Sequence, residues 1–463
     1  MVFSSITFLV LFLPVVIGLY FLIPGIKAKN MLLLIASLLF YGCGEPYYIL
    51  LLLIVSVINY FIARGIATGS HGRMFLVVGV VTHLLFLGFF KYTGFLLTSI
   101  NNLGFGIPVP KIILPIGISF YTFQMISYLI DVYRDKSLLQ KNYCNLILYI
   151  SFFPQLIAGP IIRYADFATQ LHSRKHSLES AALGFRRFTF GLAKKVLIAN
   201  TMSSLVDTLY AYDANNFNIV VGWVAAILYC LQIYYDFSGY SDMALGMAKM
   251  CGFTFHENFQ YPYEATSIKE FWRKWHISLS SWFREYLYIP LGGNRKGMGR
   301  TIVNKYVVFF CTGLWHGASL NFIIWGLIHG TFLILEDYLW VLKKIKGTAL
   351  GWIYTMLVIS CAFVFFRSEN LLQAFMILSS MFTGFTVTTA SLVDIAQFCT
   401  PYNIMLFIIA IVGMFNWKKV GARLTERQPV LGGFTYPLSF FCLLLSIMTL
   451  VAGGYNPFIY FRF

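Results

Sequence analysis

Two short histidine-bearing segments contain the residues best suited to chemistry. The sequence GLWHG at 313–317 carries His316, and GLIHG at 326–330 carries His329 after one short turn. Both patterns place glycines four positions apart in apolar stretches, which allows two membrane helices to approach closely. An imidazole with an unperturbed pKa of about 6.5 can accept and return a proton at neutral pH. The spacing therefore predicts two closely packed helices that present histidines.

The depth of His316 favours a functional role for this residue. It lies 11 residues after Lys305, or about 16 Å along a helix. That distance places His316 near the middle of a hydrocarbon core about 30 Å thick. Because an ionisable side chain is costly at that depth, it normally faces a polar cavity or a partner. We expect His316 to deprotonate a hydroxyl as the hydroxyl attacks a thioester or ester carbonyl, and His329 to support the packing.

A third histidine lies in a segment with a strong amphipathic pattern. Ser267 and Glu270 have the spacing of a capping box, which predicts a helix start. Large apolar residues then recur at helical spacing through 268–286, with basic residues on the remaining faces. The pattern predicts one amphipathic helix at the inner membrane surface or against the bundle. His276 lies on its apolar face, where a histidine alone is more often a core residue bonded to a backbone carbonyl.

The sequence offers little support for other common chemistries. It contains no G-x-S-x-G, P-loop or H-E-x-x-H motif. His172 and His176 have metal-like spacing, but they lie in a basic stretch without a third ligand nearby. We interpret them as part of a solvated loop and expect no metal site.

Composition indicates the class of protein in which these residues operate. Hydrophobic residues make up 59% of the 463 positions and charged residues 11%, whereas ordinary globular proteins carry roughly 25% charged residues. The sequence thus predicts an all-α polytopic integral membrane protein with about 11–12 transmembrane helices around a central tunnel, plus re-entrant and interfacial helices. Disordered, collagen-like and secreted disulfide-rich proteins are excluded. The net charge of +16 fits the positive-inside rule better than nucleic-acid binding.

The distribution of basic residues predicts the orientation of the chain. With an extracytoplasmic N-terminus and alternating spans, 30 of the 34 Lys and Arg residues fall on the cytoplasmic side. The remaining four are Lys91, Lys111, Arg367 and Arg462. Because cytoplasmic loops are enriched in Lys and Arg, both termini are predicted to lie outside.

The sequence predicts a single membrane-embedded domain over 1–463. Two of its segments are not expected to be simple membrane spans. Residues 143–162 are apolar but contain Pro154, Gly159 and Pro160, which favours a re-entrant segment buried in protein. Residues 236–304 are predicted to form a long amphipathic segment on the cytoplasmic side. The other predicted parts are N-terminal helices in 1–142, the histidine-bearing helix pair in 305–340 and C-terminal helices in 341–463.

Several ordered motifs resemble the membrane-bound O-acyltransferase family. They are LPIGISFYTFQ at 114–124, FPQLIAGP at 153–160, YDFSGYSD at 235–242, FWRKWH at 271–276 and LWHG at 314–317. PLGGNRKG at 290–297 and FIYFRF at 458–463 resemble the alginate O-acetyltransferase branch. The branch that transfers D-alanyl groups to teichoic acid shares the two histidine motifs but usually lacks the glycine-rich stretch.

The resemblance implies an activity for the histidines. His316 matches the presumed catalytic histidine of the family, and His276 matches its second functional polar residue. An acyl thioester in the cytoplasm, most simply acetyl-coenzyme A, would donate its acyl group through the bundle, with no bound cofactor. A separate extracytoplasmic or membrane-anchored acyltransferase would place the group on polysaccharide or peptidoglycan. The expected location is the bacterial cytoplasmic membrane, in contact with lipid and without nucleic acid.

Six further residues are candidates for substrate contact. They are Trp275, Trp315, Asp236, Tyr240, Asn321 and His329. Asp236 and Tyr240, at the predicted inner end of a span, could instead fix a turn through side-chain hydrogen bonds.

Two alternative functions stay open at this point. One is transfer of a D-alanyl or other acyl group from a carrier protein. The other is a transporter whose histidines relay protons, although no inverted pair of interrupted spans is apparent.

Overall fold

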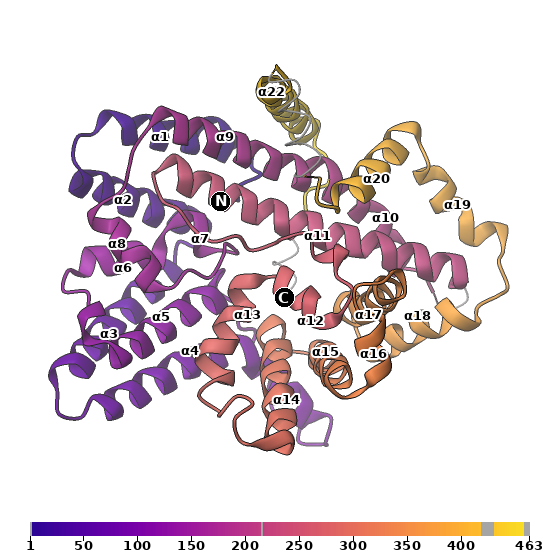
Figure 1. Cartoon of the computed structure of the whole chain (residues 1–463), viewed down its shortest axis with the longest axis horizontal. Coiled ribbons are helices and arrows are strands. Elements are labelled where there is room, and N and C mark those ends of the chain that lie inside the picture. Colours follow the sequence, from indigo (N-terminus) through magenta and orange to yellow (C-terminus); the bar gives the residue numbers. More distant parts are fainter. Residues whose placement is uncertain (1, 214–215, 418–429, 458–463) are drawn as a thin grey trace. The chain divides into compact units, whose positions relative to one another are not determined.

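Most of the described part of the chain is helical. The computed structural model describes residues 2–213, 216–417 and 430–457, and this part contains helices and no strands (Figure 1). The prediction of an all-α protein is therefore confirmed. Arg462 and the 458–463 motif lie outside the described residues.

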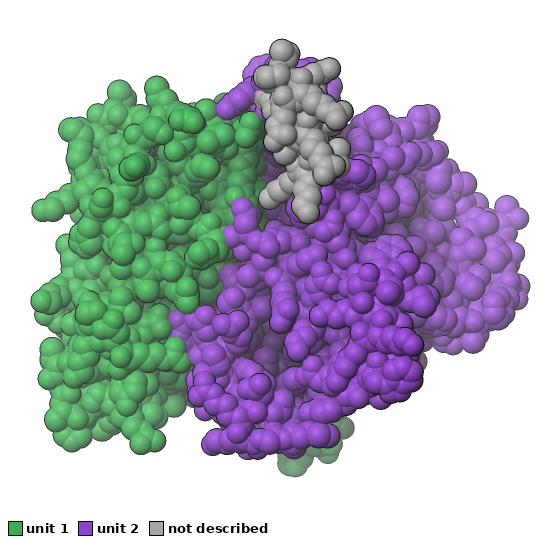
Figure 2. All heavy atoms as spheres, viewed as in Figure 1, with its two compact units in different colours: residues 1–188, 241–256 green, residues 189–240, 257–463 purple. Residues whose placement is uncertain are grey.

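The chain divides into two compact units, coloured separately in Figure 2. Unit 1 comprises residues 1–188 and 241–256, and unit 2 comprises residues 189–240 and 257–463. Helices α9 (Leu178–Ala193) and α11 (Ile219–Met250) contribute residues to both. Because the units share two helices, this division does not test the prediction of a single functional domain.

Unit 1 contains most of the N-terminal helices. They are η1 (Phe8–Phe12), α1 (Leu13–Leu22), α2 (Ile26–Gly44), α3 (Tyr48–Thr68), α4 (Gly72–Asn101), α5 (Ile118–Arg134), η2 (Lys136–Leu138), α6 (Tyr143–Ser151), α7 (Phe153–Leu156) and α8 (Tyr164–His172). The segment predicted to be re-entrant forms α6 and α7, which are separated by an extended residue, Phe152. Residues 146–162 are all buried, and the Phe153 amide donates a hydrogen bond to Ser37 Oγ at the break. Its depth in the membrane stays a prediction.

Unit 2 contains the histidine-bearing helices. Its elements are η3 (Lys194–Ala199), α10 (Asn200–Tyr210), η5 (Pro262–Glu264), α12 (Ile268–Lys274), α13 (Ile277–Phe283), η6 (Arg284–Tyr288), α14 (Gly297–His316), α15 (Leu320–Tyr338), α16 (Trp340–Ile345), α17 (Ala349–Arg367), α18 (Leu371–Thr383), α19 (Thr389–Phe398), α20 (Pro401–Gly413) and α22 (Val430–Val451). Helix α11 continues to Met250, so the helix does not end near Asp236 and Tyr240.

Within the described ranges, seven helices are long and apolar enough to cross a membrane, or eight if α19 and α20, bent by 81°, form one span. The protein is thus a multi-pass membrane protein. The number is lower than the 11–12 spans predicted because several apolar stretches form shorter or more polar helices. Helix α5, for example, has 17 residues, and α14 carries Arg300 and Lys305 in its first half.

Helices α14 and α15 run beside each other at very short range (Figure 1). A Cβ added at Gly313 would overlap the carbonyl oxygen of Phe322, and one added at Gly326 would overlap the carbonyl oxygen of Phe309. The close approach predicted from the two glycine patterns is therefore confirmed, and it fixes His316 and His329 on adjoining helices.

Candidate active site

The chain is broken at His276. Helix α12 ends at Lys274 and α13 begins at Ile277, with His276 in a left-handed conformation at φ 43° and ψ 54°. The prediction of one continuous amphipathic helix is therefore wrong. Backbone groups near the break pair with a neighbouring segment instead: the Gln260 amide donates to the Lys274 carbonyl and the Ile277 amide to the Asn258 carbonyl, both at 2.9 Å.

Asn258 holds the histidine at this break. Its Oδ1 accepts hydrogen bonds from the Ser278 amide at 3.1 Å and the Ser278 hydroxyl at 2.9 Å, and lies 3.3 Å from His276 Nδ1. Because the amide oxygen can only accept, this contact favours the tautomer with a proton on Nδ1. The lone pair is then on Nε2. Sequence reasoning missed Asn258, since nothing in its position along the chain indicated contact with His276.

His276 is a fully buried, neutral imidazole. Burial lowers its pKa to about 3, so the ring carries no charge at neutral pH. Its polar partners are the side chains of Asn258 and Ser278 and not the backbone carbonyl that an ordinary core histidine would use. A left-handed residue other than glycine is also uncommon and is found most often at functional sites. These features favour a specific role over simple packing.

Helix α12 is tied at its start to α15. Ser267 Oγ accepts a hydrogen bond from the Glu270 amide at 3.1 Å, as the capping-box pattern predicts. Glu270 reaches back to the Thr266 amide at 3.0 Å, one residue earlier than the pattern requires. The carboxylate of Glu336 on α15 accepts from the Ile268 amide and, at 2.9 Å, from the Lys269 amide. Negative charge at a helix N-terminus is stabilising, so this contact anchors the helix that precedes His276.

The three histidines belong to one buried aromatic cluster, here called the histidine–tryptophan cluster. Ring centroids of neighbouring members are 4.9–5.9 Å apart, in the order His276, Trp315, His316, Trp325, His329 and Trp272. All six side chains are buried. The structure thus places His316 and His276 in the same cluster, where Trp315 contacts both rings. Their functional roles stay a prediction.

Several polar atoms of this cluster are buried without a hydrogen-bond partner in the described part of the chain. They are His276 Nε2, both ring nitrogens of His329, and the indole nitrogens of Trp272 and Trp325. Buried polar atoms in proteins are normally hydrogen-bonded to protein, water or ligand. A region with so many of them is suited to binding a polar ligand.

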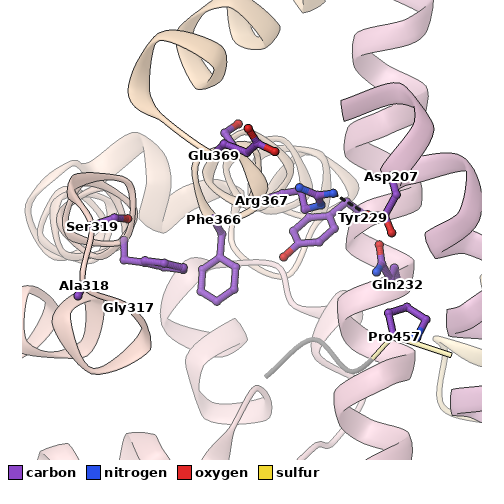
Figure 3. Close-up of a pocket in the computed structure, with 12 residues that line it drawn as sticks. Asp207, Tyr229, Gln232, Gly317, Ala318, Ser319, Phe366, Arg367, Glu369 and Pro457 are labelled. Carbon is purple, nitrogen blue, oxygen red and sulfur yellow. Dashed lines mark hydrogen bonds and ion pairs between the residues drawn. The ribbon is translucent and has the colours of Figure 1, made fainter. Parts of the chain in front are cut away.

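Two pockets flank His316 along α14. The first, here called the Gly317 pocket, has a volume of about 660 Å³ (Figure 3). It is lined by Asp207, Tyr229, Gln232, Gly317, Ala318, Ser319, Phe322, Phe366, Arg367, Ser368, Glu369 and Pro457. The second, here called the basic pocket, has a volume of about 430 Å³ and reaches along α14 as far as Thr312. Along the chain, His316 therefore lies between the residues of α14 that line the basic pocket and the turn that lines the Gly317 pocket, and its own side chain lines neither.

The basic pocket carries four cations. Lys269, Arg273, Arg284 and Lys305 line it, together with hydroxyl groups and apolar side chains. Lys269 and Lys305 share the carboxylate of one residue, Asp337. Arg273 and Arg284 have no ion-pair partner among the described residues. The excess positive charge beside apolar walls suits a ligand that combines phosphate groups with a less polar arm.

Asp236 and Tyr240 do not fix a turn, because both lie within the continuous helix α11. Asp236 forms an ion pair with Lys195 at 2.9 Å, and each side chain is 3% exposed. The turn interpretation is therefore wrong. The physical reason is that a buried lysine from η3 offsets the charge of Asp236, so the helix can continue through it.

The remaining predicted residues have mainly structural contacts. Trp275 is buried against Phe259 and Phe271, with ring centroids 5.1 and 5.4 Å away, and lines neither pocket. Asn321 donates a hydrogen bond to the Ser368 carbonyl at 2.7 Å, which ties the start of α15 to the end of α17. His329 packs within the cluster, as expected for a supporting residue.

The metal-like pair His172 and His176 is split between two environments. His172 is exposed, whereas His176 is half-buried with Nδ1 3.0 Å from the Tyr20 hydroxyl. The loop interpretation is wrong for His172, which is the last residue of α8. His176 lies in the non-helical segment that follows, where the Tyr20 hydroxyl contacts its ring. No group of three or more metal-ligating side chains occurs in the ranges that the structure describes.

Comparison with known proteins identifies the class. A model of the membrane-bound O-acyltransferase family matches residues 140–372, which include every residue of the cluster. The chain belongs to this family and is an acyltransferase. It is 45% identical over 396 residues to the probable alginate O-acetylase of Pseudomonas aeruginosa, covering 83% of this chain and 75% of that protein.

Two further relatives differ in the group or polymer that their names state. The peptidoglycan O-acetyltransferase of Helicobacter pylori is 36% identical over 422 residues, covering 82% of this chain and 80% of that protein. The teichoic acid D-alanyltransferase of Bacillus subtilis is 28% identical over 243 residues, covering 50% of this chain and 61% of that protein.

Replacing His276 with Asn should weaken the acid sensitivity of the fold. Asn tolerates the left-handed conformation, so the break should survive. In the unfolded chain His276 binds a proton below about pH 6.5, whereas in the fold its pKa is about 3. The unfolded state therefore binds more protons, and the free energy of unfolding falls as the pH drops below 6.5. Melting temperatures between pH 7 and 5 should fall less steeply for His276→Asn than for the wild type. Equal slopes would contradict the buried neutral state.

Proposed function

We propose that this protein transfers an acetyl group from acetyl-coenzyme A in the cytoplasm to an acceptor outside, for O-acetylation of a surface polysaccharide or peptidoglycan. The observation that carries the proposal is the position of His316 on α14, between the basic pocket and the Gly317 pocket. A donor in one pocket and an acceptor in the other would meet at this residue.

The basic pocket is the proposed donor side. Its lining comes from 269–288, from 305–312 of α14 and from Leu333, and positive-inside counting assigns most of this region to the cytoplasm. The guanidinium groups of Arg273 and Arg284, which have no ion-pair partner among the residues that the structure describes, suit the phosphates of coenzyme A. The names of the more similar relatives, acetylases at 45% and 36% identity, favour acetyl over the D-alanyl group.

His316 is the proposed catalytic base. Its imidazole accepts the proton of the acceptor hydroxyl as that oxygen attacks the thioester carbonyl. The carbon–sulfur bond then breaks, and the departing thiolate takes the proton from the imidazolium. His276, which is separated from His316 by the indole of Trp315, is proposed to orient the thioester. Trp315 contacts both rings and would hold their spacing.

The Gly317 pocket is the proposed acceptor side. Its lining includes the turn between α14 and α15 and the end of α17 with Arg367, which orientation counting assigns to the outside. The turn from Gly317 to Ser319 is too short to bind a polymer by itself. A separate acyltransferase, either extracytoplasmic or membrane-anchored, is therefore proposed to dock near 317–321, and the location follows as the bacterial cytoplasmic membrane.

Replacing His316 with Ala should abolish polymer acetylation while expression and membrane insertion stay close to wild type. The loss of one imidazole removes the proton acceptor and leaves the α14–α15 contact intact. Incorporation of labelled acetyl into surface polymer measures the effect. His172→Ala, which changes an exposed histidine, is the matched control. Full activity in well-expressed His316→Ala would exclude the catalytic assignment.

Replacing Arg284 with Gln should raise the KM for acetyl-coenzyme A about tenfold with little change in kcat, because one charge-assisted contact to phosphate is lost. Acetyl-pantetheine, which lacks phosphates, should show no such difference between the variant and the wild type. Arg295→Gln changes a cation that does not line the pocket and is the control. An equal effect on both thioesters would argue against phosphate recognition.

The isolated chain should acetylate polymer poorly. With acetyl-coenzyme A and polymer on opposite sides of a reconstituted membrane, we expect little product until the partner acyltransferase is added. Leu320→Asp, at an exposed position after the turn, should then weaken the partner's effect. Efficient acetylation of polymer without any partner would refute this part of the proposal.

A further inference from the structure

A buried ion pair joins η3 to the apolar helix α11. Lys195 Nζ is 2.9 Å from Asp236 Oδ1, and each side chain is 3% exposed. Charges inside membrane spans are costly and usually serve a function. The proposed chemistry at His316 uses neither residue, so the pair needs a separate explanation.

Lys195 also holds the C-terminal segment. Its ammonium group donates hydrogen bonds to Asn200 Oδ1 at 2.9 Å and to the carbonyl of Pro457, and it forms an ion pair with Asp236. One of its two hydrogen-bond acceptors therefore belongs to the C-terminal segment. If Pro457 left, one donor of a buried ammonium would lack its acceptor, which is unfavourable.

Two neighbouring contacts extend this attachment along η3 and α10. Asn200 Nδ2 donates to Asn456 Oδ1 at 3.1 Å. The hydroxyl of Tyr455 donates to Asp207 Oδ2 at 2.6 Å. Residues 455–457 thus bind three successive polar groups from the end of α10 toward the start of η3.

The segment forms part of the wall of the Gly317 pocket. Pro457 lines this pocket with Gln232, which lies one turn before Asp236 on α11 (Figure 3). Asp207, which binds Tyr455, also pairs with Arg367 at 2.5 Å on the pocket wall. The attachment of the segment and the pocket lining therefore share the same residues.

We propose that Lys195 and Asp236 are positioning residues that hold segment 455–457 as a wall of the acceptor-side pocket, and that this wall keeps bulk water from the acyl group. The inference rests on the proposed function, because it takes the Gly317 pocket as the acceptor side. A closed site protects a reactive acyl group from hydrolysis. Without the wall, water competes with the acceptor hydroxyl: its oxygen bonds to the acetyl carbon, the carbon–sulfur bond breaks, and acetate and free thiol result.

Two variants of the full reconstituted protein test the proposal. The first ends after Gly454, which removes the segment and leaves the ion pair. The second, Lys195→Met with Asp236→Leu, removes both charges together, because a buried pair can often be replaced by apolar residues without loss of stability. Release of free thiol from acetyl-coenzyme A, without acceptor or partner, measures hydrolysis. Both variants should hydrolyse the thioester at least about threefold faster than the wild type.

The controls separate this proposal from simple damage. Lys194→Met changes the neighbouring lysine and should leave hydrolysis unchanged. Adding His316→Ala to the truncated chain should abolish the extra hydrolysis. Damage to the fold should lower the rate of thioester hydrolysis, whereas loss of a barrier to water should raise it.

The outcomes also distinguish this inference from the proposed function. Unchanged or slower hydrolysis by a well-folded truncated chain would overturn the inference, even if the double variant failed to fold. If the wild type showed no transfer that depends on His316, the proposed function itself would fail.

Discussion

The contact between α14 and α15 at Gly313 and Gly326 is the constraint on which the candidate site depends. No side chain fits between the two backbones at these points. The contact fixes His316 at the end of α14 and His329 within α15. Trp325, packed 5.0 Å from both rings, then closes the space between them. A wider separation of the helices would leave a cavity where the structure has a continuous layer of rings.

The charged side chains in the interior and those that line the basic pocket differ in whether they have ion-pair or hydrogen-bond partners. The interior charges of unit 2 have specific partners: Asp236 pairs with Lys195, and Glu336 accepts the first amides of α12. By contrast, Arg273 and Arg284 line the basic pocket without an ion-pair partner in the described part of the chain. Because unpaired cations beside apolar walls attract anions, this contrast separates charges that hold the fold from charges available to a ligand.

Much of the fold and the centre of the site could be predicted from local sequence. The glycine spacing predicted the α14–α15 contact. The two histidine motifs singled out His316, His276 and Trp315, whose rings lie next to one another in the structure. The break at His276 could not be predicted, because the apolar periodicity of 268–286 is that of a continuous helix. What breaks it is Asn258, 18 positions earlier, and such long-range pairing leaves no local pattern. The partner of Asp236 was missed for the same reason, since Lys195 is distant in sequence.

The central claim is that His316 lies between pockets that open to opposite sides of the membrane. Single cysteines at Ala318, in the Gly317 pocket, and at Ser281, in the basic pocket, test it directly with a membrane-impermeant maleimide. Labelling above the parent chain, which has 8 native cysteines, is the measurement. Ala318→Cys should react in intact cells, and Ser281→Cys should react only in inverted vesicles. Reaction of both positions from the same side would contradict the account.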